Sequence, residues 1–101
     1  MNGYSLYDRK TLSYGVPFFA TTDGAAVRSL TDLTADTNTI VAQHPGDFVL
    51  FLVGRFAPTT GELLPITPAQ HVCDALSVAP ESRQSSMDFS KPNGTAKEVT
   101  S

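Results

Sequence analysis

The chain has 101 residues, of which 41% are apolar, and it carries a formal charge of −3 at pH 7. This length predicts a single domain, and the acid excess excludes the clustered Lys and Arg typical of an autonomous duplex-DNA binder. One cysteine, Cys73, excludes an internal disulfide framework and fits a reducing compartment. The first residues do not have the basic start and apolar stretch of a signal peptide, so we expect a cytoplasmic protein with no membrane span.

The N-terminal segment predicts two short extended stretches. Residues 4–7 alternate, with Tyr4 and Leu6 on one face of a strand, and residues 11–15 follow as a loop. Residues 16–21 are apolar and extended, and Pro17 restricts their first half to an edge position because it has no N–H to donate.

The main helix is predicted at residues 23–35. Thr22 or Asp23 is a suitable cap, since side-chain oxygens at this position accept hydrogen bonds from the first free backbone N–H groups. Apolar side chains recur at helical spacing on one face, namely Ala26, Val27, Leu30 and Leu33. In the connection that follows, Ile40 and Val41 are expected to pack against the core.

The longest apolar run, residues 48–53, predicts a strand at residues 47–56 that is buried on both faces. Alternation places two sets of side chains on opposite faces: Phe48, Leu50, Leu52 and Phe56 on one, and Val49, Phe51 and Val53 on the other. A strand of this kind must be covered twice, either by two elements of its own chain or by a second copy of it.

A hairpin loop is predicted at residues 57–61, where Pro58 suits a type I turn and Gly61 suits a positive φ. The return strand begins at Glu62, and Pro65 predicts that it is an edge strand that ends early. Thr67 and Pro68 then resemble a helix start and predict a short second helix at residues 67–77.

These elements predict an α+β fold, with a small antiparallel sheet of three to four strands, a main helix and a short second helix. Residues 1–77 form the predicted domain. Polar residues dominate the rest, so residues 78–101 are predicted to be a disordered or loosely docked tail, in which Met87 and Phe89 could contact a partner.

No catalytic or metal-binding pattern stands out. His71, Cys73 and Asp74 are the only cluster of metal-type ligands, and they lack the spacing of a zinc site. His44 has no partner that the sequence identifies, and the glycines form neither a dinucleotide fingerprint nor a P-loop. We therefore expect no enzyme activity, cofactor or metal.

Single-stranded nucleic acid is a better candidate ligand, because aromatic stacking beside a few cations suffices to bind it. The candidate residues are Arg9, Lys10, Arg28, Arg55, Tyr7 and Tyr14. The alternative for the tyrosines is ordinary sheet packing. Arg55 interrupts the apolar strand on the predicted face of Val49 and Val53, and its alternative is a strand-end charge that reaches solvent.

A set of separated segments carries a family resemblance over residues 4–76. They are residues 4–10, Pro17-Phe18, residues 23–28, residues 44–48, the positions Leu50, Gly54 and Phe56, and Gly61-Glu62-Leu63. With these segments the chain resembles the small non-structural protein of gokushoviruses, the microvirus subfamily with circular single-stranded DNA genomes. The chain departs from the family at Ala57, where members often carry an acid, and in its tail.

The resemblance implies a viral early protein of the host cytoplasm that binds DNA or the replication complex in the switch from duplex replication to single-strand synthesis and packaging. Its partners would be single-stranded DNA or viral and host replication proteins. The matching polar positions are Asp8, Lys10, Asp23, Arg28, His44, Asp47 and Arg55, and no catalytic residues come with them. The alternative is a homodimeric interaction module without nucleic-acid contact, joined through the sheet around residues 48–56.

Overall fold

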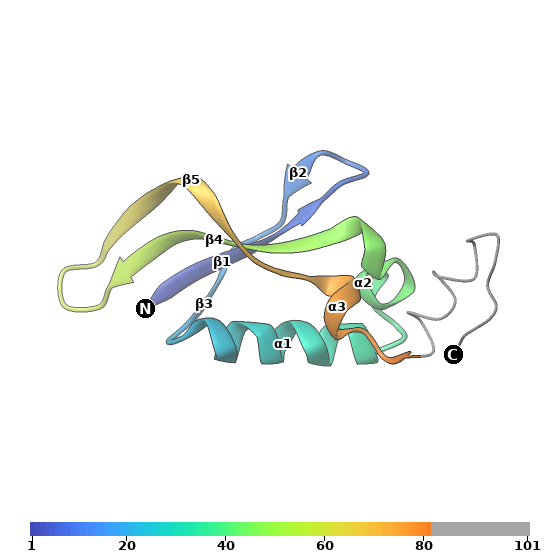
Figure 1. The fold of residues 1–101 in the computed structure, drawn as a ribbon. Coiled ribbons are helices and arrows are strands. Elements are labelled where there is room, and N and C mark those ends of the chain that lie inside the picture. The colour runs from blue at the N-terminus through green and yellow to red at the C-terminus, as the bar shows by residue number, and fades with distance from the viewer. Residues whose placement is uncertain (82–101) are drawn as a thin grey trace.

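The computed structural model describes residues 1–81, which form a curled antiparallel sheet lying over one long helix (Figure 1). The strands are β1 (Asn2–Asp8), β2 (Ser13–Tyr14), β3 (Phe18–Ala20), β4 (Phe48–Ala57) and β5 (Glu62–Asp74). The helices are α1 (Asp23–Ala35), α2 (Ile40–Gln43) and α3 (Ala75–Val78), with a 3-10 turn η1 (Pro45–Asp47) before β4. None of the helices in this part of the chain is long and apolar enough to cross a membrane.

The sheet has the order β2-β1-β4-β5, and β3 pairs with the same strand as β2, at the other end of β1. The α+β class is therefore confirmed, but the sheet has five strands rather than three or four. The additional strand is β2, which lies within the predicted loop of residues 11–15 and has only two residues, too few to produce a recognisable alternation.

Helix α1 occupies the predicted residues. Thr22 is its N-cap, and the Thr22 hydroxyl accepts a hydrogen bond from the backbone N–H of Ala25 at 3.1 Å. The buried side of the helix presents Ala26 and Leu30 to the sheet.

The core lies between α1 and the inner face of the sheet, which we define as the face toward that helix. Tyr4, Leu50 and Leu52 come from the two central strands and pack with the buried residues of α1. Val41 from α2 is also buried, as expected, whereas Ile40 is exposed, which corrects the prediction that both would pack against the core. In so short a helix only one side faces the sheet.

The β4–β5 hairpin confirms the predicted loop. Gly61 has φ of 79°, and its N–H donates to the Ala57 carbonyl at 2.7 Å. β5 is an edge strand, as predicted, but it does not end early at Pro65: it continues to Asp74.

The second helix is consequently much shorter than predicted. Residues 67–74 belong to β5, and only residues 75–78 are helical. The reason is tertiary pairing: residues 70–74 pair with residues 49–52 of β4, whose backbone groups would otherwise lack partners on that side. α3 extends to Val78, and Ala79 is buried, so packing continues just past the predicted domain end. The prediction for the tail from residue 82 onward lies outside the described residues.

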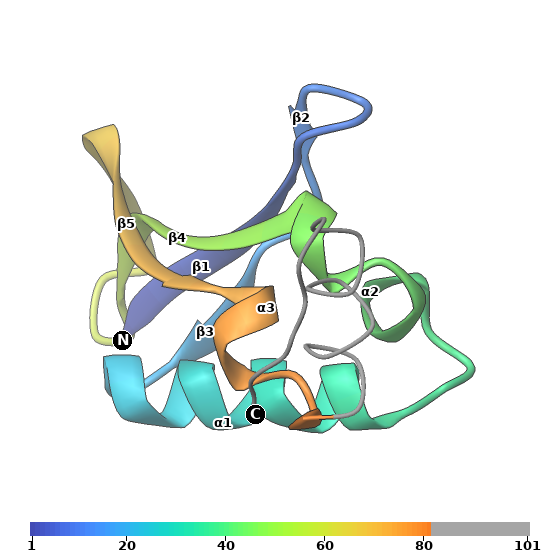
Figure 2. The same ribbon diagram turned by 45° about the vertical axis from the view of Figure 1, so that its right-hand side comes forward.

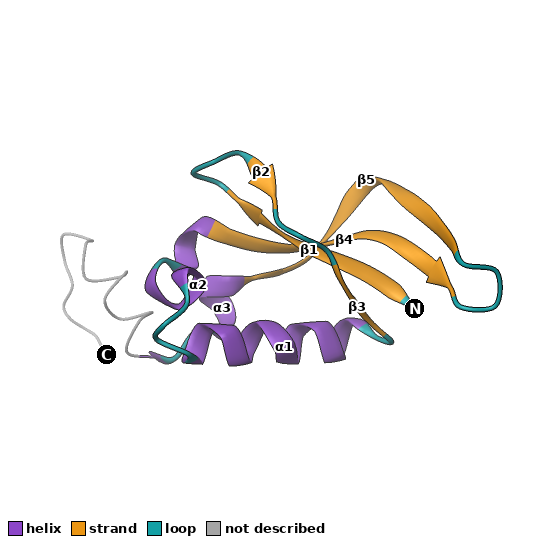
Figure 3. Ribbon diagram, turned by 180° about the vertical axis from the view of Figure 1, so that it is seen from behind, coloured by secondary structure: helices purple, strands orange, loops and turns teal. Residues whose placement is uncertain are grey.

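A bulge in β4 changes which side chains face the helix. The pairing with β1 passes from Leu52 opposite Tyr4 to Gly54 opposite Gly3, which leaves Val53 as an extra residue. Phe56 therefore leaves the predicted face of Leu50 and packs its ring 5.8 Å from that of Phe19. Figure 3 shows the N-terminus at this same hairpin end, where the Met1 amino group donates to the Phe56 carbonyl at 2.9 Å.

Candidate nucleic-acid interface

The outer face of the sheet, which we define as the face away from α1, carries the second set of side chains from each central strand. Since Tyr4 and Leu6 point into the core, Ser5 and Tyr7 point outward from β1. By the same alternation Val49 and Phe51 point outward from β4, and their partners on β5, Asp74 and His71, share that face. The outer face curves, because β2 and β5 both bend away from α1 (Figure 2).

Four aromatic side chains gather on this face, one from each strand of the path β2-β1-β4-β5. We call Tyr14, Tyr7, Phe51 and His71 the outer aromatic cluster. The ring of Tyr7 lies 4.9 Å from that of Tyr14, and Phe51 lies 5.7 Å from Tyr14 and 6.0 Å from His71. Two members are strongly exposed, Tyr14 at 48% and the His71 side chain at 57%. The cluster is thus an open row of rings.

The local backbone explains why these rings meet. The chain reverses after β1 through Leu12, which has a left-handed φ of 58°. The N–H of Gly15 then donates to the Leu6 carbonyl at 2.8 Å, while the Ser5 hydroxyl donates to the Gly15 carbonyl at 2.7 Å. These bonds hold Tyr14 opposite Tyr7. On the other side, a bulge at Val72 places His71 opposite Phe51.

The rings also cover the outer side of β4. Val49 is buried although it points away from α1, and its neighbours across the sheet are Tyr7 and Asp74. Phe51 and Val53 are only partly buried. The predicted burial of this strand on both faces is therefore met in part by the chain itself.

Arg9 is held at the end of the cluster by three contacts. Its backbone N–H donates to the Asp47 carbonyl at 2.8 Å, and its guanidinium Nη1 donates to the Gly46 carbonyl at 2.9 Å. Its Nη2 lies 3.9 Å from Asp74 Oδ1, and the same oxygen lies 2.9 Å from His71 Nε2. Ion pairs this exposed contribute little stability, so their effect is to place a cation beside the rings.

The structure brings together only part of the predicted site. Tyr7, Tyr14 and Arg9 lie together, and Lys10 follows Arg9 in the same loop, where its N–H donates to Asp8 Oδ1 at 2.8 Å. Arg28 lies on α1, in the other layer of the fold.

Arg55 is not on the face of Val49 and Val53, which corrects that prediction. Beyond the bulge its partner on β1 is Asn2, whose side chain hydrogen-bonds the Tyr4 hydroxyl on the inner side. Arg55 therefore lies on the inner side of the sheet, at the hairpin end.

Two members of the outer aromatic cluster were absent from the predicted site. The alternation of side chains in residues 48–53 predicts Phe51 on the face opposite Leu50. That pattern was therefore a signal that could have identified Phe51 as part of the site. His71 was assigned to a helix, and its position opposite Phe51 depends on a strand pairing that the local sequence does not show.

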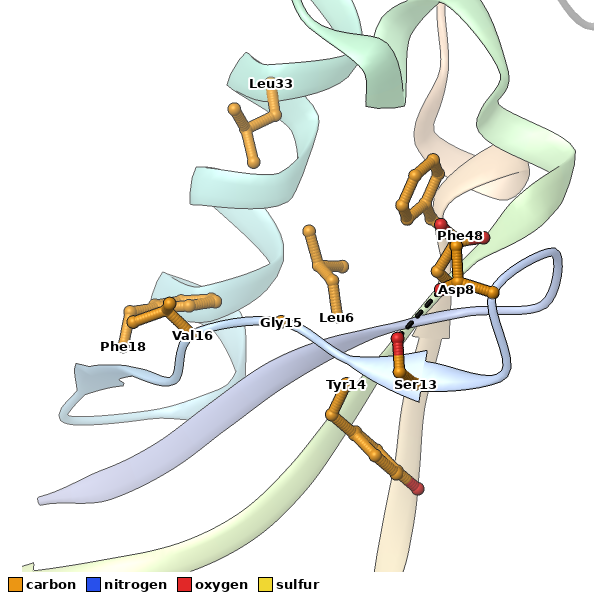
Figure 4. Close-up of a pocket in the computed structure, with 10 residues that line it drawn as sticks. Leu6, Asp8, Ser13, Tyr14, Gly15, Val16, Phe18, Leu33 and Phe48 are labelled. Atoms are coloured by element: carbon orange, nitrogen blue, oxygen red, sulfur yellow. Dashed lines mark hydrogen bonds between the residues drawn. The ribbon is translucent and has the colours of Figure 1, made fainter.

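A separate hollow of about 370 Å³ opens on the inner side, between α1 and the β1–β2 hairpin (Figure 4). Its apolar lining includes Leu6, Leu33 and Phe48, while the ring of Tyr14 turns away to the opposite face (Figure 4). His44 lines a neighbouring hollow with Asp8 and Asp47. Within residues 1–81, no group of three or more potential metal ligands occurs.

The fold and the outer aromatic cluster define a small α+β protein with an open, ring-lined sheet face. Its sequence places it more narrowly: residues 1–78 match the family described as Phage ORF5 protein, and the chain belongs to that family. The match ends at the last residue of α3, so it covers every strand and helix named above.

The chain is also 34% identical to Protein ORF5 of Chlamydia phage 1, a gokushovirus of the Microviridae, over 67 residues. The match covers 62% of this chain and 70% of the relative. The resemblance to the small non-structural proteins of gokushoviruses is thus confirmed, and the protein is a phage non-structural protein. Comparison with the solved structures gave no significant match.

Proposed function

We propose that this protein binds single-stranded DNA through the outer aromatic cluster and acts as an accessory factor in viral single-strand synthesis in the host cytoplasm. The observation that carries the proposal is the exposed row of rings drawn from four strands, with Arg9 fixed at its end. Bases of a single strand stack on such rings, and this stacking contributes about 1–3 kcal/mol per base.

The geometry favours a single strand over a duplex. The rings lie on the outer face of the sheet, and none of the helices within residues 1–81 projects from that face so that it could enter a major groove (Figure 2). A chain with a formal charge of −3 also has too few cations to follow two phosphate backbones. In a single strand the bases are already free to stack, so the rings supply the affinity that the charges do not.

We propose binding without catalysis. The nearest arrangement to a catalytic pair is His71 with Asp74, and both side chains lie on the open face, about half exposed. A catalytic pair must act on a substrate held beside it, and neither side chain is enclosed in a way that would hold one. Asp74 instead orients the His71 ring and the Arg9 guanidinium beside the cluster.

Fluorescence anisotropy with a labelled oligothymidylate of about eight nucleotides, at low salt, tests the proposal. Tyr14→Ala removes an exposed ring at little cost to the core, and we expect the dissociation constant to rise about fivefold or more. Tyr14→Phe keeps the ring and should bind nearly as the unmodified chain does.

Phe19→Ala is the matched control, because it removes another exposed ring from a site outside the cluster. It should leave the affinity unchanged. Equal losses for Tyr14→Ala and Phe19→Ala, or no binding by the unmodified chain at low salt, would contradict the proposed function.

A further inference from the structure

A second exposed surface lies at the hairpin end of the sheet, where it includes side chains of both faces, away from the aromatic cluster. The β4–β5 hairpin extends past the N-terminal end of α1, so the helix does not cover it (Figure 1). Leu63 is 67% exposed and Leu64 is 53% exposed, although they are adjacent in β5 and point to opposite faces. Phe19 is exposed beside the ring of Phe56. We call Phe19, Phe56, Leu63 and Leu64 the hairpin-end patch.

The patch combines a hollow with projecting side chains. A hollow of about 240 Å³ is lined mostly by apolar groups, among them Pro17, Phe19 and Val53. The hollow forms where Gly3 of β1 and Gly54 of β4 pair, because neither residue has a side chain to fill the space. The exposed leucines stand at its border. A surface with both a hollow and a projection is able to fit a copy of itself about a two-fold axis.

The charged residues at the patch are also complementary to the same residues on a second copy of the chain. Arg55 lies beside Leu64 in the register, and Glu62 begins the same strand. Within residues 1–81 the ion pairs are Arg9–Asp74 and His71–Asp74, so neither Arg55 nor Glu62 has an ion-pair partner there. Two copies related by a two-fold axis could pair each Arg55 with the other copy's Glu62. The charges of Arg55 and Glu62 cancel, and the Met1 amino group at the Phe56 carbonyl adds a positive charge, so this end of the sheet does not share the acid excess of a chain of charge −3.

We infer that the hairpin-end patch is the contact surface for a second copy of this chain. The contact is made by side chains rather than by strand addition, because Pro65 and Pro68 in the edge strand β5 have no N–H to donate to another strand. β4 itself is unavailable for backbone pairing, since β1 and β5 occupy both of its edges. The predicted dimer thus uses the hairpin end rather than the centre of residues 48–56.

Sedimentation velocity of the full chain over a range of concentrations tests the inference. The unmodified chain is expected to approach twice its monomer mass as concentration rises. Leu63→Asp places a charge on the exposed apolar part of the contact, and the dimer dissociation constant is expected to rise more than about tenfold. Leu12→Asp is the matched control: Leu12 is 73% exposed in the β1–β2 loop, and aspartate tolerates its left-handed φ.

Charge exchange provides a second and independent test. Arg55→Glu alone should weaken the dimer, whereas Arg55→Glu combined with Glu62→Arg should restore it. A chain that stays monomeric at its highest soluble concentration would overturn the inference, as would equal effects of Leu63→Asp and Leu12→Asp. DNA binding by Leu63→Asp should be unchanged for a short oligonucleotide, so failure of the dimer and failure of the proposed function are separate results.

Discussion

The hydroxyl group of Tyr4 links the sheet to the first turn of α1. The Tyr4 side chain is fully buried, and its hydroxyl donates to Asp23 Oδ1 at 2.6 Å while accepting from the side-chain amide of Asn2 at 3.1 Å. Burial raises the pKa of Tyr4 above its ordinary value, and the hydrogen bond to Asp23 raises it further, because a phenolate would lie beside a carboxylate. The neutral phenol is therefore part of the folded structure.

Replacing Tyr4 with phenylalanine should lower the free energy of unfolding by about 1–2 kcal/mol at neutral pH, since it removes one charge-assisted hydrogen bond. The pH dependence has a definite sign. A pKa raised on folding gives stability that is complete below the unfolded-state value of about 10 and is lost as the pH rises through the folded-state pKa. Urea unfolding at pH 8 and at about pH 11 should therefore show a smaller alkaline loss for Tyr4→Phe than for the unmodified chain. Equal alkaline losses would mean that the Tyr4 phenol does not couple to folding.

At the scale of single residues, the sequence indicated part of the candidate site. Tyr7, Tyr14 and Arg9 were selected from residue type and proximity to strands, and these are the ones that the fold gathers. Arg28 and Arg55 are also cationic but lie in other parts of the molecule. Residue type alone does not indicate on which face of a sheet, or in which layer, a side chain lies. For Arg55 the decisive event is the bulge at Val53, one extra residue that reverses the faces beyond it.

At the scale of elements, the sequence predicted those helices and strands whose signals are local, but not those that depend on pairing with a distant strand. α1 matched its predicted residues because its cap and its apolar spacing are both encoded within the helix. The second half of β5 has an equally clear local signal for a helix start at Thr67, and that signal is overridden by pairing with β4. The hydrogen bonds of a sheet depend on a partner strand that no short window of sequence contains.

The close approach of β4 and β5 at Gly54 gives an element-scale prediction. A Cβ at position 54 would lie 2.9 Å from the carbonyl oxygen of Leu64, a backbone atom that cannot rotate away. We expect Gly54→Ala to lower the free energy of unfolding by about 1–3 kcal/mol, because the hairpin must shift to admit the methyl group. Chemical denaturation checks this.

Gly24→Ala is its control. The nearest atom to a Cβ at position 24 is the Thr22 hydroxyl at 3.9 Å, and alanine is the better helix former in α1. This variant should be as stable as the unmodified chain or slightly more so. Similar stability of the two alanine variants would show that the hairpin is more adaptable at Gly54 than its backbone contact indicates.

At the scale of the whole molecule, the single long helix covers only part of the sheet. The rest of the sheet is exposed and can serve as binding surfaces. α1 covers the inner face, the four rings lie on the outer face, and the hairpin-end patch lies at the hairpin end, where both faces of the sheet are exposed. Changes at sites this far apart and without shared partners usually add independently. Tyr14→Ala should therefore affect DNA affinity alone, and Leu63→Asp the association of copies alone.

Charge over the whole molecule predicts how DNA binding depends on salt. Of the cationic side chains within residues 1–81, only Arg9 and Lys10 lie near the cluster, and Asp8 and Asp74 lie beside them, so this part of the chain can neutralise about two phosphates. For single strands this corresponds to a slope of about −1.4 in log affinity against log salt. Arg9→Ala should make the slope shallower by about 0.7, whereas Tyr14→Ala should lower affinity equally at all salt concentrations, since stacking releases no counterions. Anisotropy titrations across a salt series measure both quantities.

A slope of about −4 or steeper would require more phosphate contacts than this end of the sheet supplies. It would place the DNA instead along a surface that includes Arg28 or Arg55.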